Sequence, residues 1–367
     1  MSAHAVGDIL ERVQRRLADE QTEPDPARLA AIVREEAVVI SDVDVLSIMR
    51  TLRDNTAGAG PLEAVLSGAD VTDVCVNGPD AIYVDRGRGL EASELRFASD
   101  AEVRRLAVRL AAGCGRRLDD AQPYCDGHIC RPDGSILRFH AVLAPTAQQG
   151  TCISLRVLRG NTTTLDQLEA AGSIASDCAG LLRRIVAERS SFLVVGGTGA
   201  GKTTLLSALL AAADPAERII AIEDTVELAP AHPHVLNLTT RGNNAEGAGM
   251  ISIADLVRQA LRMRPDRLVV GEIRGAEVVD LLAALNTGHD GGAGTLHANS
   301  VREVPARMEA LAALGGLDRA GLHSQLAAAV DYVIVVKRRG DGTRRVHQVA
   351  ALTGNPVTVE LVWEDAP

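Results

Sequence analysis

A run of small residues followed by a lysine and two threonines carries the most specific chemistry in this sequence. Residues 192–206 read FLVVGGTGAGKTTLL, which matches the pattern G-x-x-x-x-G-K-[ST] with Gly196, Gly201, Lys202 and Thr203 in the fixed positions. Glycines allow consecutive backbone N–H groups to turn towards one anion, and a following helix directs its positive N-terminal end at the same point. The segment therefore predicts a phosphate-binding loop for a nucleoside triphosphate.

Each part of this loop has an expected contact with the nucleotide. Lys202 is expected to reach the outer phosphates, and the hydroxyl of Thr203 is expected to ligate Mg²⁺. A glycine-rich turn that matched by chance would not need an apolar strand before it and a helix-forming segment after it, and both are present here. ATP and Mg²⁺ are the predicted cofactors, and the other residues expected to bind them are Gly196, Gly197, Thr198, Gly199, Ala200, Gly201 and Thr204.

Two carboxylates follow apolar segments further along the chain. Residues 218–222 predict a buried strand that ends in Glu223, and residues 267–271 predict another that ends in Glu272. In doubly wound sheets, ligands lie beyond the carboxyl ends of the strands, where the phosphate loop is also expected. Carboxylates there can hold Mg²⁺ and orient or deprotonate an attacking water. Glu223 and Glu272 are therefore candidate catalytic and Mg²⁺-binding residues; we favour Glu272 as the water-activating one, and the residues alone leave the choice open.

One histidine stands in a comparable position. Residues 294–296 predict a short strand, and His297 follows it directly. A single histidine is more often structural than catalytic. Because His297 ends a strand that follows the Glu272 strand, it is a candidate sensor of the γ-phosphate.

The hydrophobic patterns divide the chain into three parts that position these residues. Residues 1–55 have apolar residues at helical spacing and predict a helical extension. Residues 56–160 combine short alternating strands with an amphipathic helix, which predicts a small α+β domain. Residues 161–367 alternate strands with helices and predict an α/β domain with a parallel sheet, after a polar, hinge-like segment at 159–163.

Local signals place individual elements within these parts. Thr164 with Gln167 forms a capping box that opens a helix, and Ser252 with Asp255 opens another. The other helices are expected over residues 9–17, 26–36, 43–53, 100–112 and 276–286, and further strands over residues 71–76, 81–84, 135–142 and 152–157.

Composition limits the classes of function. The net charge of −10 argues against a broad surface for nucleic acid, and 2% aromatic residues leave few side chains on which bases could stack. Cys125, Cys130 and His128 lie close in sequence, but no second ligand pair with zinc spacing follows, so reduced, inert thiols are expected. No apolar stretch has the length of a membrane span and the N-terminus lacks an apolar signal core, which predicts a cytoplasmic protein.

Taken together, the motifs resemble those of the secretion and pilus ATPase superfamily, in particular its CpaF/TadA-type branch, which serves Tad (Flp) pilus assembly. GGTGAGKTT resembles the Walker A motif and IIAIEDTVEL the Asp box; LVRQALRMRPDRLVVGEIRG resembles the Walker B region with Glu272, and NTGHDGGAGTLHANS the His box with His289 and His297. Upstream, GPLEAVL, VNGPDAIYVDRGRGLE and RPDGS are similar to the N-terminal domain of the family. The resemblance covers about residues 58–340.

This resemblance implies more than the residues show by themselves. The fold it implies is a RecA-like C-terminal P-loop domain preceded by a small α+β domain, assembled into a ring that is usually a hexamer, with ATP between the two domains. It implies that Arg138 and Arg156 approach the outer phosphates, and that Arg241 and Arg258 act similarly from the same or a neighbouring subunit. Its expected partners are further copies of the chain and an inner-membrane platform protein, at the cytoplasmic face of that membrane, without direct binding of nucleic acid.

Other functions remain open at this point. A conjugation or type IV secretion ATPase belongs to the same superfamily and differs in partner and cargo. A RecA-type nucleic-acid translocase is compatible with the same motifs, although the acidic balance argues against it. A small-molecule kinase would need an acceptor site, for which the sequence offers no feature.

Overall fold

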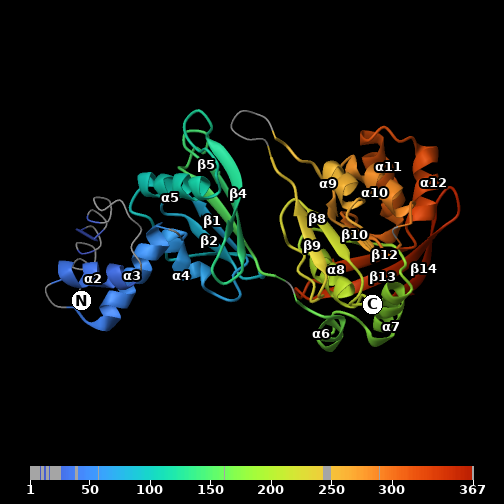
Figure 1. Ribbon diagram of the computed structural model, residues 1–367, viewed down its shortest axis with the longest axis horizontal. Helices are drawn as coiled ribbons and strands as arrows, with labels where there is room; N and C mark the ends of the chain where they lie inside the picture. Colours follow the sequence, from blue (N-terminus) through green and yellow to red (C-terminus); the bar gives the residue numbers. More distant parts are fainter. Residues whose placement is uncertain are drawn as a thin grey trace. The chain divides into compact units, whose positions relative to one another are not determined.

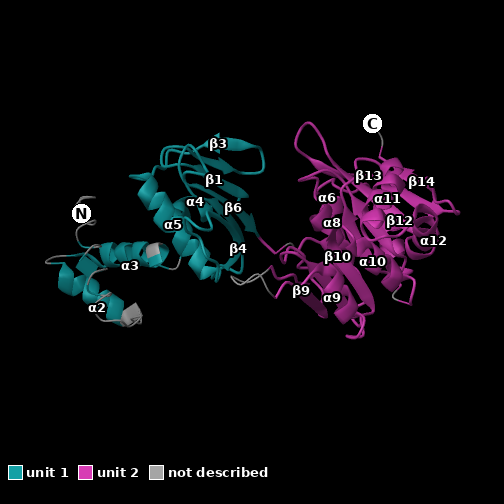
Figure 2. Cartoon of the chain, turned by 90° about the horizontal axis from the view of Figure 1, so that it is seen from above, with its two compact units in different colours: residues 1–158 teal, residues 159–367 magenta. Residues whose placement is uncertain are grey.

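The protein has two compact units, residues Met1–Leu158 and Arg159–Pro367, which are coloured separately in Figure 2. The computed structural model used here describes residues 9, 12–13, 16, 26–37, 40–56, 58–160, 162–242, 249–288 and 290–365.

In the first unit, the structure describes two helices, α2 (Pro26–Glu36) and α3 (Asp42–Thr56), as expected for residues 26–36 and 43–53. They pack on each other through an apolar cluster that includes Ile32, Val33, Val45, Ile48 and Leu52. The helix expected over residues 9–17 falls largely outside the described residues.

An antiparallel sheet forms the body of this unit, with the strand order β3-β2-β1-β6-β5-β4. Helix α5 (Asp100–Gly113) packs on it and buries Val103, Leu106 and Leu110. Strands β5 and β6 alternate buried and exposed side chains, so their other face carries polar residues. The elements of this sheet and the short helices before it are η1 (Gly60–Leu62), α4 (Glu63–Leu66), β1 (Asp73–Asn77), β2 (Ile82–Asp85), β3 (Leu90–Ala92), β4 (Tyr124–Cys130), β5 (Ile136–Val142) and β6 (Cys152–Leu158).

The second unit is built on an eight-stranded sheet with the order β14-β13-β12-β7-β11-β10-β8-β9. The six strands from β12 to β9 are parallel, and β13 and β14 extend the sheet as an antiparallel edge. This is the predicted α/β class with a parallel core. The strands are β7 (Phe192–Val195), β8 (Ile219–Glu223), β9 (Val235–Thr239), β10 (Arg267–Ile273), β11 (Ala293–Leu296), β12 (Tyr332–Arg338), β13 (Arg344–Thr353) and β14 (Thr358–Glu364).

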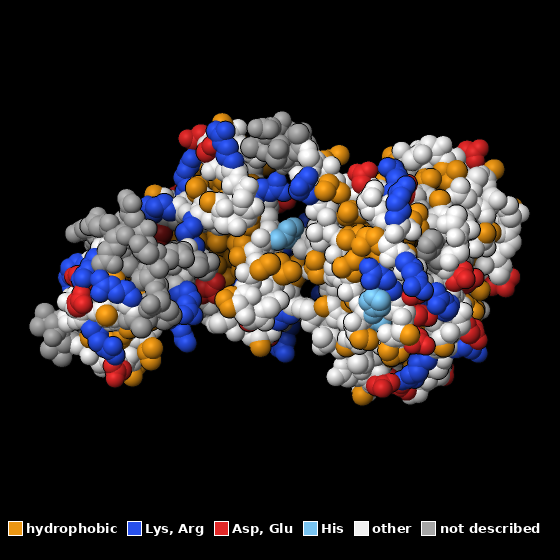
Figure 3. Space-filling view, in the orientation of Figure 1, with side chains coloured by type: hydrophobic (Ala, Val, Ile, Leu, Met, Phe, Trp, Pro, Cys, Tyr) orange, Lys and Arg blue, Asp and Glu red, His pale blue; other side chains and the backbone are white. Residues whose placement is uncertain are grey.

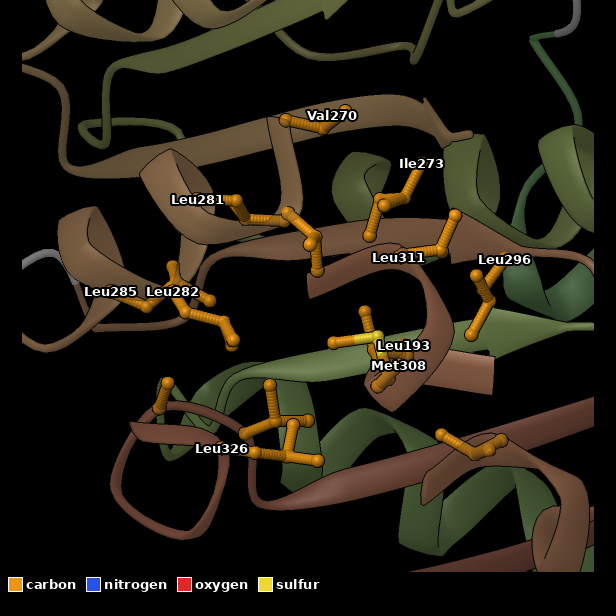
Figure 4. Close-up of a cluster of buried hydrophobic side chains, with 14 of the residues drawn as sticks. Leu193, Val270, Ile273, Leu281, Leu282, Leu285, Leu296, Met308, Leu311 and Leu326 are labelled. Carbon is orange, nitrogen blue, oxygen red and sulfur yellow. The ribbon is translucent and has the colours of Figure 1, made fainter. Parts of the chain in front are cut away.

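Helices cover both faces of this sheet (Figure 1). Because successive strand residues point to opposite faces, Leu193 and Val195 join one core while Phe192 and Val194 join the other. Figure 4 shows the first core, in which Met308 and Leu326 lie over residues of the sheet. It contains side chains of α9 (Ile253–Ala260), α10 (Glu277–Leu285), α11 (Val304–Leu314) and α12 (Arg319–Ala329); the other contains those of α6 (Leu165–Ala170), α7 (Ser176–Ala187) and α8 (Lys202–Ala211).

Both predicted helix starts have a capping box. The Thr164 side chain accepts a hydrogen bond from the N–H of Gln167 and opens α6, and Ser252 does the same with Asp255 at the start of α9. Each box satisfies N–H groups that the first helical turn leaves without a partner.

An ion pair is buried at the start of strand β10. The guanidinium of Arg267, which is 1% exposed, pairs with the Glu217 carboxylate and donates to the carbonyls of Gly291, at 3.2 Å, and Val186, at 2.8 Å. Gly291 has φ 76°, and a Cβ there would lie 2.6 Å from Nη1 of Arg267. Arg267 therefore connects strand β10 to the three segments that contain Glu217, Val186 and Gly291.

On the face of the second unit seen in Figure 3, Lys and Arg side chains lie among Asp and Glu side chains. No helix within the described ranges is both long and apolar enough to cross a bilayer.

Candidate nucleotide-binding site

The predicted phosphate loop joins β7, which ends at Val195, to α8, which begins at Lys202. Gly199 and Gly201 have φ values of 70° and 97°, in the left-handed region that favours glycine. Gly196 is required for a different reason, because a Cβ there would lie 2.4 Å from the carbonyl oxygen of Val336 on the neighbouring strand. The loop thus has the strand-loop-helix geometry of an anion site at a helix N-terminus.

Lys202 lies inside this loop. Its side chain is buried, and its Nζ donates to the carbonyl oxygens of Gly196 and Gly197, both at 3.1 Å. Burial lowers the pKa of Lys202, and the negative charge of Glu272 acts in the opposite direction. Because Nζ of Lys202 already contacts two carbonyl oxygens of the loop, its ammonium group is close enough to contact an anion held there.

The parallel strands β10 and β11 bring Glu272 and His297 together. Nε2 of His297 lies 2.7 Å from Oε1 of Glu272 but is not aligned to donate to it, so Oε1 is buried without a hydrogen bond from any described residue. Thr295 ties the two strands together by donating to the carbonyl of Gly271, at 2.6 Å.

Arg274 holds the other oxygen of this carboxylate. Its guanidinium pairs with Oε2 of Glu272 and reaches Asp224 at 3.2 Å. Burial alone would raise the pKa of Glu272, but Arg274, His297 and Lys202 lower it below its ordinary value. Glu272 is therefore a carboxylate at neutral pH, with one oxygen beside Arg274 and the other beside His297.

Glu223 has a different environment. Its buried carboxylate accepts the N–H groups of Glu227, at 3.1 Å, and Leu228, at 3.1 and 3.3 Å. A Cβ at Gly271 would lie 2.5 Å from Cγ of Glu223, so a glycine on β10 makes room for this side chain. Glu223 thus stabilises the turn that follows β8, whereas Glu272 contacts His297.

The titration of Glu223 should be measurable. Burial raises its pKa from 4.5 to about 7, so between these values the native state holds a proton that the unfolded state has released. The protonated carboxyl contributes stability that is fully present below about pH 4.5 and is lost as the pH rises through about 7. We expect the unfolding free energy of the wild type, relative to Glu223→Gln, to fall over this range in urea titrations. Parallel pH profiles for the two proteins would contradict this expectation.

Two further predicted residues lie apart from this group. The guanidinium of Arg241 donates to the carbonyl of Gly249 at 2.8 Å. Arg258, on α9, reaches Asp280 at 3.1 Å and Asp255 at 3.4 Å. Among the described residues, neither arginine has a recorded contact with the phosphate loop. His289 lies outside the described residues.

In the first unit, the structure brings Arg138 and Arg156 together. They are direct partners across β5 and β6, and both side chains lie on the exposed face of the sheet. The Nε of Arg156 donates to Asp73 at 2.8 Å. Like charges directly opposite one another are unfavourable, so this pair of arginines is suited to an anionic ligand.

The residues of the second unit suit Mg²⁺ to different degrees. Hard cations prefer oxygen ligands. Oε1 of Glu272, which lies beside His297, and the Thr203 hydroxyl on the first turn of α8 provide such oxygens. The carboxylate of Glu223 already accepts two backbone N–H groups, so it is the least suited of the three predicted ligands.

Sequence reasoning missed two residues at this site. Arg274 follows Glu272 by two positions, and its charge directly after a buried strand was a usable signal. Arg344 comes from β13, yet its Nε donates to the carbonyl of Gly199 at 2.9 Å. A cavity of about 600 Å³ adjoins this contact and is lined in part by Gly201, Thr204 and Arg344. No local pattern linked Arg344 to a loop so distant in sequence.

Comparisons with known proteins agree with this geometry. The family described as type II/IV secretion system protein matches residues 55–354. The chain is 58% identical over 316 residues to a Mycobacterium tuberculosis protein, Rv3659c, provisionally named as a conjugal transfer protein, covering 86% of this chain and 90% of that one. It is 31% identical over 312 residues to the type IV secretion system protein PtlH of Bordetella pertussis, covering 76% and 89%.

Solved structures show a similar fold. The Legionella pneumophila ATPase DotB has a TM-score of 0.57 at 22% identity, covering 80% of this chain and 79% of that chain. The pilus retraction motor PilT with bound ADP has a TM-score of 0.57 at 19% identity, covering 83% of each. At these identities the likeness concerns the fold alone.

Proposed function

Because the chain belongs to the type II/IV secretion system protein family, we propose that it is a Mg²⁺-dependent ATPase that powers transport or pilus assembly at the cell envelope. The observation that carries this proposal is the phosphate loop with the buried Lys202, close to the Glu272 carboxylate, which Arg274 and His297 flank. Relatives named for conjugal transfer and type IV secretion support the same activity class.

The residues have distinct roles in the proposed reaction. Backbone N–H groups of the loop and the N-terminus of α8 bind the phosphates, and Lys202 exchanges its two carbonyl partners for phosphate oxygens. Glu272 orients the attacking water with its ionised carboxylate, while His297 contacts that carboxylate from the neighbouring strand and is proposed to contact the γ-phosphate. Mg²⁺, when bound, neutralises phosphate charge; Thr203 and Glu272 are the residues suited to hold it.

Two pathways remain as candidates. Conjugal transfer or type IV secretion is favoured by the names of the relatives, including the one at 58% identity. Tad (Flp) pilus assembly rests on the motif resemblance. Strains carrying Glu272→Gln distinguish them: loss of DNA or protein transfer with intact pili supports the first, and loss of pili with intact transfer supports the second. In either case we propose an inner-membrane platform protein as partner.

A RecA-type nucleic-acid translocase is the alternative from another class. The net charge of −10 argues against it. Stimulation of ATP hydrolysis by single-stranded DNA would favour it, and a phosphorylated small-molecule product would instead indicate a kinase.

Ring assembly gives a direct test of the motor. We propose that several copies of the chain act together as a ring. A substitution of one of the paired arginines of the first unit tests this. ATP hydrolysis per subunit should rise with protein concentration as the mass of the particle increases, and Arg138→Ala should lower this rate by about 10²-fold or more because a guanidinium that stabilises transferring phosphate is lost. The measurements are steady-state hydrolysis and light scattering on the same samples. Full activity of a monomer, unaffected by Arg138→Ala, would exclude the ring mechanism.

A further inference from the structure

The hairpin of β12 and β13 contacts the phosphate loop at three points. At one end of the loop, the carbonyl of Val336 approaches Gly196 too closely for any side chain. In the middle, Nε of Arg344 donates to the carbonyl of Gly199 at 2.9 Å. At the other end, Cδ of Arg344 would lie 3.1 Å from a Cβ at Gly201. The loop is thus bordered by a segment that begins more than a hundred residues later in the chain.

Hydrogen bonds and ion pairs hold the turn that leads into Arg344. Arg339 donates its N–H to the carbonyl of Thr343 at 2.8 Å, and Asp341 accepts from the N–H and hydroxyl of Thr343 at 2.9 and 2.6 Å. The buried Asp365 pairs with Arg339, at 2.7 Å, and with Arg345, at 3.5 Å. No carboxylate among the described residues pairs with Arg344. Its guanidinium therefore contacts the loop carbonyl of Gly199 without a carboxylate competing for it.

Peptide planarity gives this contact a consequence inside the loop. The carbonyl of Gly199 and the N–H of Ala200 belong to one planar peptide unit and point in opposite directions. Because Arg344 holds the carbonyl, the N–H of Ala200 is directed to the other side of this peptide, where it reaches the carbonyl of Gly197 at 3.3 Å, the same carbonyl that Lys202 contacts. This long hydrogen bond can be given up when a phosphate offers a charged acceptor.

We propose that Arg344 is a positioning residue for nucleotide binding. It fixes the Gly199–Ala200 peptide with its N–H towards the phosphates, and so couples the C-terminal hairpin to the affinity for nucleotide. The proposal rests on the proposed nucleotide-binding function. In this proposal Lys202 differs from Arg344, because Lys202 exchanges its loop carbonyls for phosphate, whereas Arg344 keeps its hydrogen bond to Gly199 when nucleotide binds.

Two substitutions separate the hydrogen bond from the rest of the side chain. Arg344→Met keeps an apolar stem without a donor, and Arg344→Gln places an amide N–H at the position of Nε without the charge. ADP binding to the full chain, measured by calorimetry, should weaken about tenfold in Arg344→Met, and by less than about threefold in Arg344→Gln. In steady-state hydrolysis, KM should rise in Arg344→Met while kcat changes little.

Controls distinguish this role from others. Lys337→Met removes an exposed cation from the same hairpin and should leave ADP affinity unchanged, and the melting temperature without nucleotide should be alike in all variants. If Arg344→Met and Arg344→Gln weaken ADP binding equally, the effect is due to the lost charge, and the positioning role is overturned. Unchanged ADP affinity in Arg344→Met would also overturn it. If the wild type itself fails to bind ADP, the proposed function fails, which is a different outcome from an unaffected Arg344→Met variant.

Discussion

Replacing Glu272 by glutamine is expected to lower kcat for ATP hydrolysis by about 10²–10⁴-fold, the usual contribution of a positioned acid or base. The carboxylate is ionised at neutral pH because Arg274, His297 and Lys202 lower its pKa against the effect of burial. A glutamine keeps the size and one acceptor oxygen but cannot take a proton from water. Affinity for ADP should stay within about threefold of the wild type, because the phosphate contacts are made by the loop.

Glu223→Gln is the matched control for this experiment. It removes a carboxylate at the end of a neighbouring parallel strand, yet retains an oxygen that can accept the N–H groups of Glu227 and Leu228. We expect kcat to fall less than about tenfold, with the main effect on the pH dependence of stability. If instead Glu223→Gln abolished turnover and Glu272→Gln did not, the water-activating role would belong to Glu223.

Replacing Glu217 by alanine is expected to destabilise the second unit by about 3–5 kcal/mol, since it leaves a charge buried without its partner. Arg267 is 1% exposed, and its remaining contacts are the neutral carbonyls of Val186 and Gly291. The free energy of unfolding, from urea titrations followed by circular dichroism, measures the effect. Loss of the Arg267–Glu217 ion pair should also reduce nucleotide binding, because the segment after Gly291 leads to β11 and His297.

An exposed ion pair of the same unit provides the comparison. Arg183 pairs with Asp166 at 2.6 Å, but these side chains are 42% and 84% exposed. Asp166→Ala should therefore change stability by less than about 1 kcal/mol. Equal effects of Asp166→Ala and Glu217→Ala would show that burial does not give the Arg267 pair its importance.

Elements with a clear hydrophobic period could be predicted from the sequence. The parallel core strands β7, β8, β10 and β11 are buried apolar runs, and α5 and α10 have one apolar face, so each was expected near its observed bounds. Strand β3 has all three side chains exposed and so lacks the alternation on which a strand prediction depends, whereas β4 alternates but has a glycine and a cysteine as its buried residues, which gives a weak apolar signal. The pairing of β12 with β7 joins distant segments and leaves no local signal.

The residues of the site also differ in whether they could be predicted from the sequence. The loop glycines, Lys202, Glu272 and His297 were named because phosphate chemistry and strand ends restrict residue type, and the structure brings the last three together. The register that sets Arg138 against Arg156 could not be seen, because it depends on the alignment of β5 with β6. Arg344 was missed since its contact spans 145 residues. Assigned roles for all of these residues stay predictions until they are tested by substitution.

The position of β7 between β11 and β12 has a consequence for biosynthesis. The strand that carries the phosphate loop gains its second neighbour only with residues 332–338, and the contact from Arg344 comes later still. Chains are made at about 5–20 residues per second, and domains generally fold as units once their segments are available. A nascent chain that already contains every residue of the loop therefore lacks the strand that borders it. We therefore expect the loop to bind nucleotide only after residues 332–344 have been made and have taken their places beside β7 and the loop.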